Sequence, residues 1–574
     1  YLTAALANDL AHTAGGAFRP VIVVTARIDR ADNVGEQLLA WSPDLRVLAF
    51  PEPNALFYER TPWGPRSTRA RLRVLAELTD GKCRHGSTNT VIVTSARGLM
   101  QRTLPPELMH SHRLTVESGQ PIPGGQPDIF LQSLLQMGYK PVTVVTEAGT
   151  FSRRGGILDV FPAAADQPVR IELWGDEVES LRIFDPATQR SLNTCPFVSL
   201  TPAREALPVY GPAVAARLKD WFAAFPASEG SQADPLNPRA DEERLRQQYT
   251  FDTLEFYLPW MFDRPVSLLE YLPPGALVLI DDWAELADTV ADLEAQALSL
   301  RQAGIEAGSI PPDMPLPLIT WSQIGDELAQ AGALELGGYL PPEAESGGAQ
   351  SLGDRFVPGP RFAGELKHFL NHLRSLTHSS RDRVLVVTRQ AERLAALWSE
   401  HILGMLPTTA GDVDVPPPPG QPLFVQGGLA EGWQLQDDIT THLFTDAEIF
   451  GWRRPEPRRR RQPRAVTPED FFADLTPGDI VVHAEYGIGR FEGLEKRSLA
   501  GATREFLLVS FSGGDMLYVP IHQADRLSRY IGADDTPPEL SRLGTAEWSR
   551  AKERTREAVE EVARELLDLY AAKL

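Results

Sequence analysis

The run Leu277-Val278-Leu279-Ile280-Asp281-Asp282 joins four apolar residues to two carboxylates. A short, unbroken apolar run is typical of a parallel strand that is buried on both faces of a sheet. Similar runs occupy residues 21–25, 46–50 and 91–94, and stretches with a helical pattern lie between them. Because strands alternate with helices, the sequence predicts a doubly wound α/β fold.

The two carboxylates at the end of this run look like a Walker B pair, which would serve a Mg²⁺ bound to nucleotide. That role needs a glycine-rich phosphate loop with a Lys, and no GxxxxGK[ST] motif occurs in the chain. Gly15-Gly16 precedes the first clear strand and leads to no Lys-Ser/Thr pair. Asp281 and Asp282 instead suit a strand end followed by a helix N-terminus, where acidic residues are favourable. We therefore expect an NTPase-like scaffold without an NTPase site.

Other sites of chemistry are also missing from the sequence. No HExxH motif, no GxSxG motif and no Cys/His cluster with metal-ligand spacing occurs. The only two cysteines, Cys83 and Cys195, are far apart, which argues against a disulfide framework and fits a reducing cytosol. We expect no catalytic residue, no metal and no cofactor in this chain, and a cytoplasmic location.

Composition points to protein partners. Of the 574 residues, 43% are hydrophobic and 23% are charged, as in soluble globular proteins, and the length predicts several domains. The net charge of −21 repels a polyanion, so avid DNA binding by this chain alone is not expected. The chain begins at Tyr1 rather than Met and ends at Leu574 inside a predicted helix, which suggests a piece of a longer protein.

The pattern along the chain divides it into parts of different character. An α/β pattern occupies residues 1–112, 201–310 and 325–452, and a small α+β insertion is predicted at residues 113–200. An Arg/Pro-rich linker follows at residues 453–466, and it is either a flexible tether or a tether that contacts anions. A small strand-rich barrel is predicted at residues 467–532 and a long helix at residues 546–574.

The insertion contains a predicted hairpin with a two-residue turn, Trp174-Gly175-Asp176-Glu177. Short strands are predicted at residues 142–145, 156–161, 169–174 and 178–184. Simple alternation places side chains 171, 173, 178 and 180 on one face and 170, 172, 177 and 179 on the other. The alternation slips near residues 180–182, which leaves a β-bulge open there.

Several of these segments resemble a known family. Residues 149–162 and 170–185 are similar to the UvrA-binding domain shared by UvrB and the bacterial transcription-repair coupling factors (the Mfd family). Residues 267–282 resemble the approach to the UvrB Walker B strand, without its phosphate loop. Further matching segments are residues 50–60, 427–451 and 477–520, the last resembling the RNA-polymerase-interacting domain shared with CarD-type regulators. The chain thus resembles the N-terminal, non-motor portion of the coupling factors.

The resemblance implies an architecture. Residues 1–112, 113–200 and 201–310 would be UvrB-like domains 1a, 2 and 1b, residues 325–452 a further α/β domain, and residues 467–532 a CarD/Tudor-like β-barrel. The helix at residues 546–574 would lead to an ATP-driven DNA translocase motor of helicase superfamily 2, which uses ATP and Mg²⁺ and makes most of the DNA contacts. This chain would itself be a monomeric, non-enzymatic portion.

The resemblance also implies a function. The chain would bind stalled RNA polymerase through its β subunit and recruit UvrA for nucleotide excision repair. Two alternatives stay open: an active UvrB-like helicase, against which the missing Lys argues, and a CarD-like transcription regulator that binds polymerase but not UvrA. In the family, the UvrA-binding surface is masked in the resting protein.

The matching hairpin indicates Arg170, Arg182 and Phe184 as UvrA-binding residues. The alternative is that these residues only decorate a strand, with an ion pair to Glu172 or Glu179.

In the barrel, the family implies that the strand containing Arg504, Phe506, Leu507, Leu508 and Val509 presents an edge to the polymerase β subunit. Because side chains alternate, only half of them can face a partner while the others fill the barrel core.

Overall fold

The structure is a computed structural model that describes residues 1–13, 18–80, 89–224, 238–262, 264–336, 355–379, 382–401, 408–411, 413, 416–451, 477–483, 486–499, 502–520, 527–529 and 540–542. The chain forms two compact units, Tyr1–Pro457 and Arg458–Leu574. The predicted linker at residues 453–466, the predicted helix at residues 546–574 and Cys83 lie outside the described residues.

The first sheet of the first unit is parallel and has the order β13-β12-β1-β3-β2. Its strands are β1 (Val21–Thr25), β2 (Arg46–Phe50), β3 (Thr90–Ser95), β12 (Leu277–Ile280) and β13 (Leu334–Glu335). β1 is buried throughout and pairs with β3 on one side and β12 on the other, so residues far apart in the sequence share one sheet. The predicted first and third parts of the chain thus meet in this sheet.

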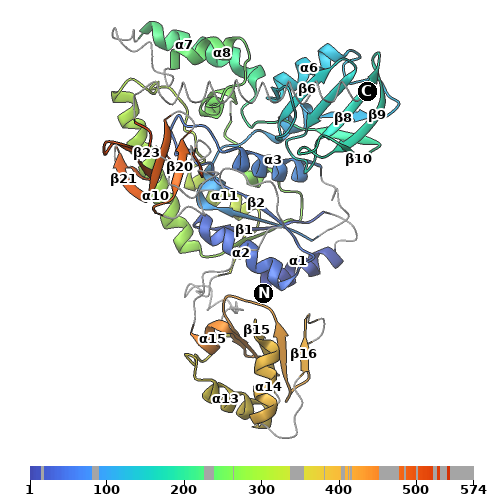
Figure 1. The fold of residues 1–574 in the computed structure, drawn as a ribbon, viewed down its shortest axis with the longest axis vertical. Coiled ribbons are helices and arrows are strands. Elements are labelled where there is room, and N and C mark those ends of the chain that lie inside the picture. Colours follow the sequence, from blue (N-terminus) through green and yellow to red (C-terminus); the bar gives the residue numbers. More distant parts are fainter. Residues whose placement is uncertain are drawn as a thin grey trace. The chain divides into compact units, whose positions relative to one another are not determined.

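Helices cover both faces of this sheet (Figure 1), as the doubly wound pattern predicts. One face packs against α1 (Leu2–Thr13) and α2 (Ile28–Trp41) through Val21 and Val23. The other face, with Ile22 and Val24, packs against the larger core that includes α3 (Pro65–Asp80), α10 (Trp283–Glu306) and α11 (Trp321–Gln330). Other α-helices of this region are α4 (Ala96–Met100), α5 (Pro106–Ser111), α7 (Gly211–Ala224), α8 (Pro238–Arg246) and α9 (Leu258–Met261).

The insertion begins and ends at a two-stranded antiparallel pair, β4 (Leu114–Glu117) and β11 (Phe197–Leu200). Between them lie α6 (Pro127–Gln136) and a six-stranded sheet in the order β10-β9-β8-β7-β6-β5 (Figure 1). Its strands are β5 (Lys140–Pro141), β6 (Thr150–Arg154), β7 (Ile157–Phe161), β8 (Val169–Trp174), β9 (Glu177–Phe184) and β10 (Ser191–Thr194).

The predicted strand at residues 142–145 is wrong, because only β5, at residues 140–141, is extended there. Val145 is fully buried against Phe161 and Phe184, whereas Val144 is exposed. Packing of Val145 therefore overrides the β-branched character of the segment.

The predicted Gly-Asp hairpin is confirmed, since Trp174 pairs directly with Glu177 across the turn. The β8–β9 register shifts so that Glu172 faces Ser180 while Leu173 faces Val178, which leaves Glu179 as the extra residue of a β-bulge. The predicted grouping of Ser180 with residues 171, 173 and 178 is therefore wrong, because the bulge that the sequence left open here places Ser180 on the face of Glu172. Leu181 instead shares the face of Ile171 and is buried.

A third sheet of the first unit has the order β14-β18-β19-β15-β17-β16. Helices α13 (Leu366–Ser379) and α14 (Ala391–His401) pack on one face of it through Phe369, Leu373 and Trp398. The elements are β14 (Phe356–Pro358), β15 (Arg383–Thr388), β16 (Thr408–Ala410), β17 (Pro422–Gln426), β18 (Trp433–Leu435), β19 (Thr441–Thr445) and α15 (Asp446–Phe450).

The second unit contains an antiparallel sheet in the order β23-β22-β21-β20-β24. Its core is formed by residues that include Phe491, Leu507 and Val509. The strands are β20 (Ile480–His483), β21 (Gly487–Leu499), β22 (Ala502–Ser510), β23 (Met516–Pro520) and β24 (Leu527–Arg529). Among the described helices of the chain, none is both long and apolar enough to cross a membrane.

Candidate functional site

The two carboxylates that end β12 are both engaged by the protein itself. Asp281 accepts two hydrogen bonds from Arg30 on α2, at 2.7 Å from Nε and 2.9 Å from Nη2. Asp282 is the N-cap of α10, where its Oδ1 accepts from the backbone N–H of Glu285 at 2.8 Å. An arginine cation thus engages both oxygens of Asp281, and the N-terminus of α10 engages one oxygen of Asp282. Within the described residues, no group of three or more His, Cys, Asp or Glu residues could hold a metal ion.

The insertion's six-stranded sheet presents a charged face, which we define by the side chains of Arg154, Asp159, Arg170, Glu172 and Arg182. These residues share one face because Arg170 pairs with Asp159 and Arg182 across the strands, and Glu172 lies two residues along β8. Arg154 lies on this face because it pairs with Ile157, which in turn pairs with Glu172.

Asp159 is the anchor of the charged face. It is 1% exposed and accepts hydrogen bonds from Arg170 Nε at 2.7 Å and Nη2 at 2.9 Å, and from Arg154 at 3.3 Å. The bond to Asp159 raises the pKa of Arg170. Because this bidentate pair holds its guanidinium in place, Arg170 is a rigid part of the surface.

Phe184, which the sequence indicated as a binding residue, is fully buried with Val145 and Phe161. Its ring lies 4.8 Å from the Arg170 guanidinium carbon. The Phe184 ring therefore packs against the Arg170 guanidinium, and Phe184 itself is not exposed at the surface.

Arg182 is the more exposed of the two arginines that the sequence indicated. Its side chain is 45% exposed, and its Nη2 lies 3.7 Å from the Glu172 carboxylate. Glu172 also accepts a hydrogen bond from Ser180. An exposed ion pair of this length is weak, so Arg182 can turn to a partner at little cost.

The charged face continues into apolar residues that the sequence reasoning missed. Trp174 lies two residues beyond Glu172 on β8 and is 78% exposed, and Ile157 is 39% exposed. Arg154, also missed, is 55% exposed at its side chain. The sequence does hold a signal for Trp174. It lies next to the hairpin turn, and it alternates with Arg170 and Glu172 along the strand, so the three side chains share one face. Exposed aromatic residues beside arginines are the composition of binding hot spots.

In the second unit, the predicted binding strand β22 is not an edge strand over most of its length. Residues 506–510 pair with β23 on one side and with β21 on the other, and only residues 502–505 extend beyond β23. The expectation that this strand presents an edge is therefore wrong for residues 506–510, because β23 covers them in the described sheet, and it stays a prediction for residues 502–505. Arg504 lies in the part that β23 does not pair with.

The side chains of β22 divide as alternation requires. Leu507 and Val509 are fully buried in the core of the sheet. Phe506 and Leu508 point to the opposite face, where Leu508 is half-buried and the Phe506 ring meets that of Tyr518 edge-on, with centroids 6.3 Å apart. Of these four residues, Leu508 is the one available for contact.

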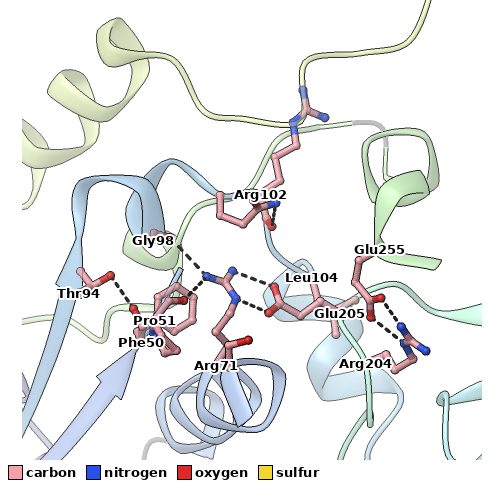
Figure 2. Close-up of polar contacts among 12 residues, drawn as sticks. Phe50, Pro51, Arg71, Thr94, Gly98, Arg102, Leu104, Arg204, Glu205 and Glu255 are labelled. Carbon is pink, nitrogen blue, oxygen red and sulfur yellow. Dashed lines mark hydrogen bonds and ion pairs between the residues drawn. The ribbon is translucent and has the colours of Figure 1, made fainter. Parts of the chain in front are cut away.

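A buried ion pair fastens the insertion to the first sheet (Figure 2). Arg71 on α3 and Glu205, which follows β11, are both 0% exposed, and the guanidinium donates to the carboxylate at 2.5 and 3.0 Å. Arg71 also donates to the Pro51 carbonyl at 3.2 Å and lies 4.0 Å from the Phe50 ring centre. Next to this pair, Arg204 binds Glu255 (Figure 2). These contacts hold the exit of the insertion in a fixed place, and the sequence reasoning did not identify them.

Comparison with known protein families finds matches for two of these regions. Residues 114–205 match the family described as UvrB interaction domain, and residues 475–531 match the family described as CarD-like/TRCF RID domain. The first range contains the charged face, and the second contains β20 to β24.

Curated relatives match nearly the whole chain. The transcription-repair-coupling factor of Bacillus subtilis (strain 168) is 26% identical over 585 residues, covering 100% of this chain and 47% of that protein. The protein of the same name from Staphylococcus aureus (strain USA300) is 26% identical, covering 96% of this chain and 46% of that protein. The chain spans about half the length of these relatives. Over its whole length it is therefore similar to the N-terminal portion of the transcription-repair-coupling factors, as its motifs predicted.

Proposed function

We propose that the chain is a recruitment scaffold of transcription-coupled DNA repair, which binds stalled RNA polymerase and recruits UvrA for nucleotide excision repair. The support comes from the two domains that match the UvrB interaction family and the CarD-like/TRCF RID family, and from relatives named transcription-repair-coupling factor. A longer parent protein would add an ATP- and Mg²⁺-dependent DNA translocase and most of the DNA contacts. This portion would act in the cytoplasm, as a monomer and without chemistry of its own.

The observation that carries the UvrA part is the exposed Trp174 beside the charged face of a matching domain. A large exposed aromatic ring next to rigidly held arginines can bury much area at small entropic cost when a partner covers it. Arg170, Arg182 and Arg154 would supply charge complementarity around the ring, and Phe184 would hold Arg170 in position. The charged face with Trp174 and Ile157 would then be the UvrA-binding surface.

For polymerase, we propose two elements of the second unit. Leu508 would contact the β subunit through the outward face of β22, and residues 502–505, including Arg504, would offer backbone groups for strand addition. The five-stranded sheet would be the CarD-like barrel.

The UvrA surface is tested with Trp174→Ala in the whole chain. Losing a central aromatic anchor costs about 2 kcal/mol or more, so UvrA affinity is expected to fall about 30-fold. Phe197→Ala is the matched control, because Phe197 is 58% exposed on β11, outside the six-stranded sheet. Equal UvrA affinity for both variants, measured by isothermal titration, would place the contact elsewhere.

The polymerase surface is tested with Leu508→Arg, which leaves the buried row of β22 intact and is expected to abolish co-elution with the polymerase β subunit. Leu494→Arg is the control, since Leu494 is 58% exposed and pairs with the core-facing Leu507. Normal polymerase binding by Leu508→Arg would refute this contact. Polymerase binding by the wild type with no UvrA binding would favour the alternative of a CarD-like regulator.

A further inference from the structure

The hairpin tip that carries Trp174 projects beyond the neighbouring strand of its sheet. β7 pairs with β8 as far as Glu172, and the Leu173 N–H donates to the Gly156 carbonyl at 2.8 Å. Trp174 and Glu177 pair with each other beyond that point. A two-stranded hairpin without further neighbours is marginally stable in water, so a tip of this kind frays unless another segment holds it.

Residues 118–122, which follow β4, pair with β9 on the side away from β8, and we name them the edge segment. The Gly119 N–H donates to the Val178 carbonyl at 2.8 Å, and the Val178 N–H donates to the Gln120 carbonyl at 2.9 Å. Both backbone groups of Val178 are therefore bonded to the edge segment. At this position β9 is not an edge strand with free backbone groups.

The edge segment also reaches the turn of the hairpin. The Ile122 N–H donates to the Asp176 carbonyl at 2.7 Å, and Pro121 forms an antiparallel bridge with Glu177, which is the partner of Trp174. Residues directly opposite each other in an antiparallel pair place their side chains on the same face. The tip is thus held on its outer side by a third length of extended chain.

The edge segment is itself fixed to the rest of the domain. Ile122 is 1% exposed and belongs, with Val178, to the larger core of the first unit. The Ser118 N–H donates to the Pro196 carbonyl at 3.0 Å, and the Ser118 hydroxyl donates to the carbonyl of the bulged residue Glu179 at 3.4 Å. An anchored segment can hold the hairpin tip in place, which a loop that moves freely could not do.

We propose that the edge segment positions Trp174 for the binding of UvrA, with Gly119 and Ile122 as positioning residues. This inference rests on the proposed function. A ring that is already held in place loses less conformational entropy when a partner covers it. Because the edge segment occupies the backbone groups of Asp176 and Val178, UvrA is recognised at this tip through side chains and not by strand addition.

The variant that tests this proposal is Gly119→Pro. Gly119 has a φ of 77°, whereas proline fixes φ at about −65° and lacks the N–H that bonds to Val178, so the edge segment must detach. The matched control is Gly308→Pro after α10. Gly308 has a φ of 67°, and its N–H donates to the Ile305 carbonyl at 3.0 Å, so the control loses the same backbone conformation and the same kind of bond.

The first measurement needs no partner. The whole chain is labelled with 5-fluorotryptophan, and the fluorine resonance of Trp174 is assigned by its absence in Trp174→Ala. In Gly119→Pro the transverse relaxation rate of this resonance is expected to fall, because the ring becomes mobile on the nanosecond timescale. In Gly308→Pro the rate is expected to match that of the wild type. An unchanged relaxation rate in Gly119→Pro would overturn the proposal.

The second measurement is the affinity for UvrA, by isothermal titration. Gly119→Pro is expected to weaken binding about 3–10-fold, because UvrA must then order a mobile ring, and Gly308→Pro is expected to leave the affinity unchanged. In the Trp174→Ala background, Gly119→Pro is expected to add no further loss, because a residue that acts only through Trp174 is coupled to it.

Two other outcomes have different meanings. Equal losses from Gly119→Pro in the wild-type and Trp174→Ala backgrounds would mean that the edge segment acts independently of Trp174, which would overturn the proposal but leave the UvrA surface intact. Full UvrA affinity of Trp174→Ala would contradict the proposed UvrA surface, and this inference with it.

Discussion

Arg71 and Glu205 each depend on the other for the neutralisation of a fully buried charge. Both side chains are 0% exposed, and the guanidinium has further contacts with the Pro51 carbonyl and the Phe50 ring. Such a pair adds little net stability compared with apolar residues of the same volume, but removal of one partner leaves a stranded charge. The pair therefore fixes the end of the insertion against α3, and it adds little net stability compared with apolar residues of the same volume.

Arg71→Met is expected to lower the free energy of unfolding of the first unit by about 3–5 kcal/mol, because Glu205 then stays buried without its cation. Urea unfolding followed by tryptophan fluorescence measures this change. The control is Arg73→Met on the same helix, since Arg73 and its partner Asp166 are 31% and 53% exposed. An exposed pair is worth at most about 1 kcal/mol. Similar losses in both variants would contradict a special role for the buried pair.

Single residues also show where sequence reasoning reached its limit. The hairpin and its turn followed from Gly175-Asp176, and alternation placed Arg170 and Glu172 together correctly. Burial of Phe184 could not be predicted, because it depends on Val145 from a distant segment. The bonds of Asp159 to Arg170 and Arg154 join three strands, so the role of Asp159 in the charged face could not be predicted from the sequence either.

At the scale of elements, helix α13 carries a histidine whose surroundings disfavour its protonated form. The His372 ring contacts the rings of Phe362 and Phe444, with centroids 5.4 and 5.9 Å away, and its Nε2 is buried without a hydrogen-bond partner among the described residues. Burial lowers its pKa, and the nearby His442 and His368 lower it further. Of the groups facing this cluster, Asp382 contacts His442 Nε2 at 3.1 Å. The folded state thus prefers neutral His372.

Because the pKa of His372 is lower when folded than when unfolded, the unfolded state binds the proton first as the pH falls. Stability is therefore full above neutral pH and is lost as the pH falls through the ordinary histidine pKa of about 6.5. We expect the amides of α13 to lose hydrogen-exchange protection between pH 7.5 and 5.5, after correction for intrinsic rates. His372→Phe is expected to reduce this loss, whereas His378→Phe, at an exposed position of the same helix, leaves it unchanged. An undiminished loss in His372→Phe would contradict the assignment.

Strands were predicted well where burial is two-sided, and also where apolar and polar residues alternate, as in β8 and β9. The apolar runs of β1, β3, β12 and β15 all proved to be strands that pair in parallel with their neighbours. The run at residues 142–145 is also rich in valine, yet it forms no strand: Val145 is buried against Phe161 and Phe184, and Val142 packs against the same cluster. The strand content of the sheet in the second unit was predictable. The pairing that covers β22 with β23 is local, because only residues 511–515 separate the two antiparallel strands, so the turn at Gly513-Gly514 was the signal for it.

At the scale of the whole molecule, the two proposed binding surfaces belong to separate compact units with separate cores. Effects of changes at distant sites without shared partners usually add within about 0.5 kcal/mol. Trp174→Ala is thus expected to weaken only UvrA binding, and Leu508→Arg only polymerase binding. The double variant should show each loss unchanged, measured by titration with each partner. A double variant whose UvrA loss depends on Leu508 would reveal coupling between the units.

The sequence also could not show that its first and third parts are one structural body. Residues 277–280 insert β12 beside β1, although more than 250 residues separate them. The chain leaves this body after β4 and returns at β11, so the insertion is bounded by two neighbouring strands. Connectivity of this kind is decided by pairing in space, which a pattern of apolar residues does not encode.

The bulge at Glu179 sets how this hairpin can change over time. Substitutions along β9 alter one side chain each. Loss of Glu179 would leave a regular ladder in which Ser180, Leu181 and Arg182 keep their present partners on β8, so Leu181 stays inward and Arg182 stays outward. A deletion of three nucleotides at this position is thus expected to leave the two faces of the strand unchanged, whereas a deletion among the paired residues of β9 would exchange them.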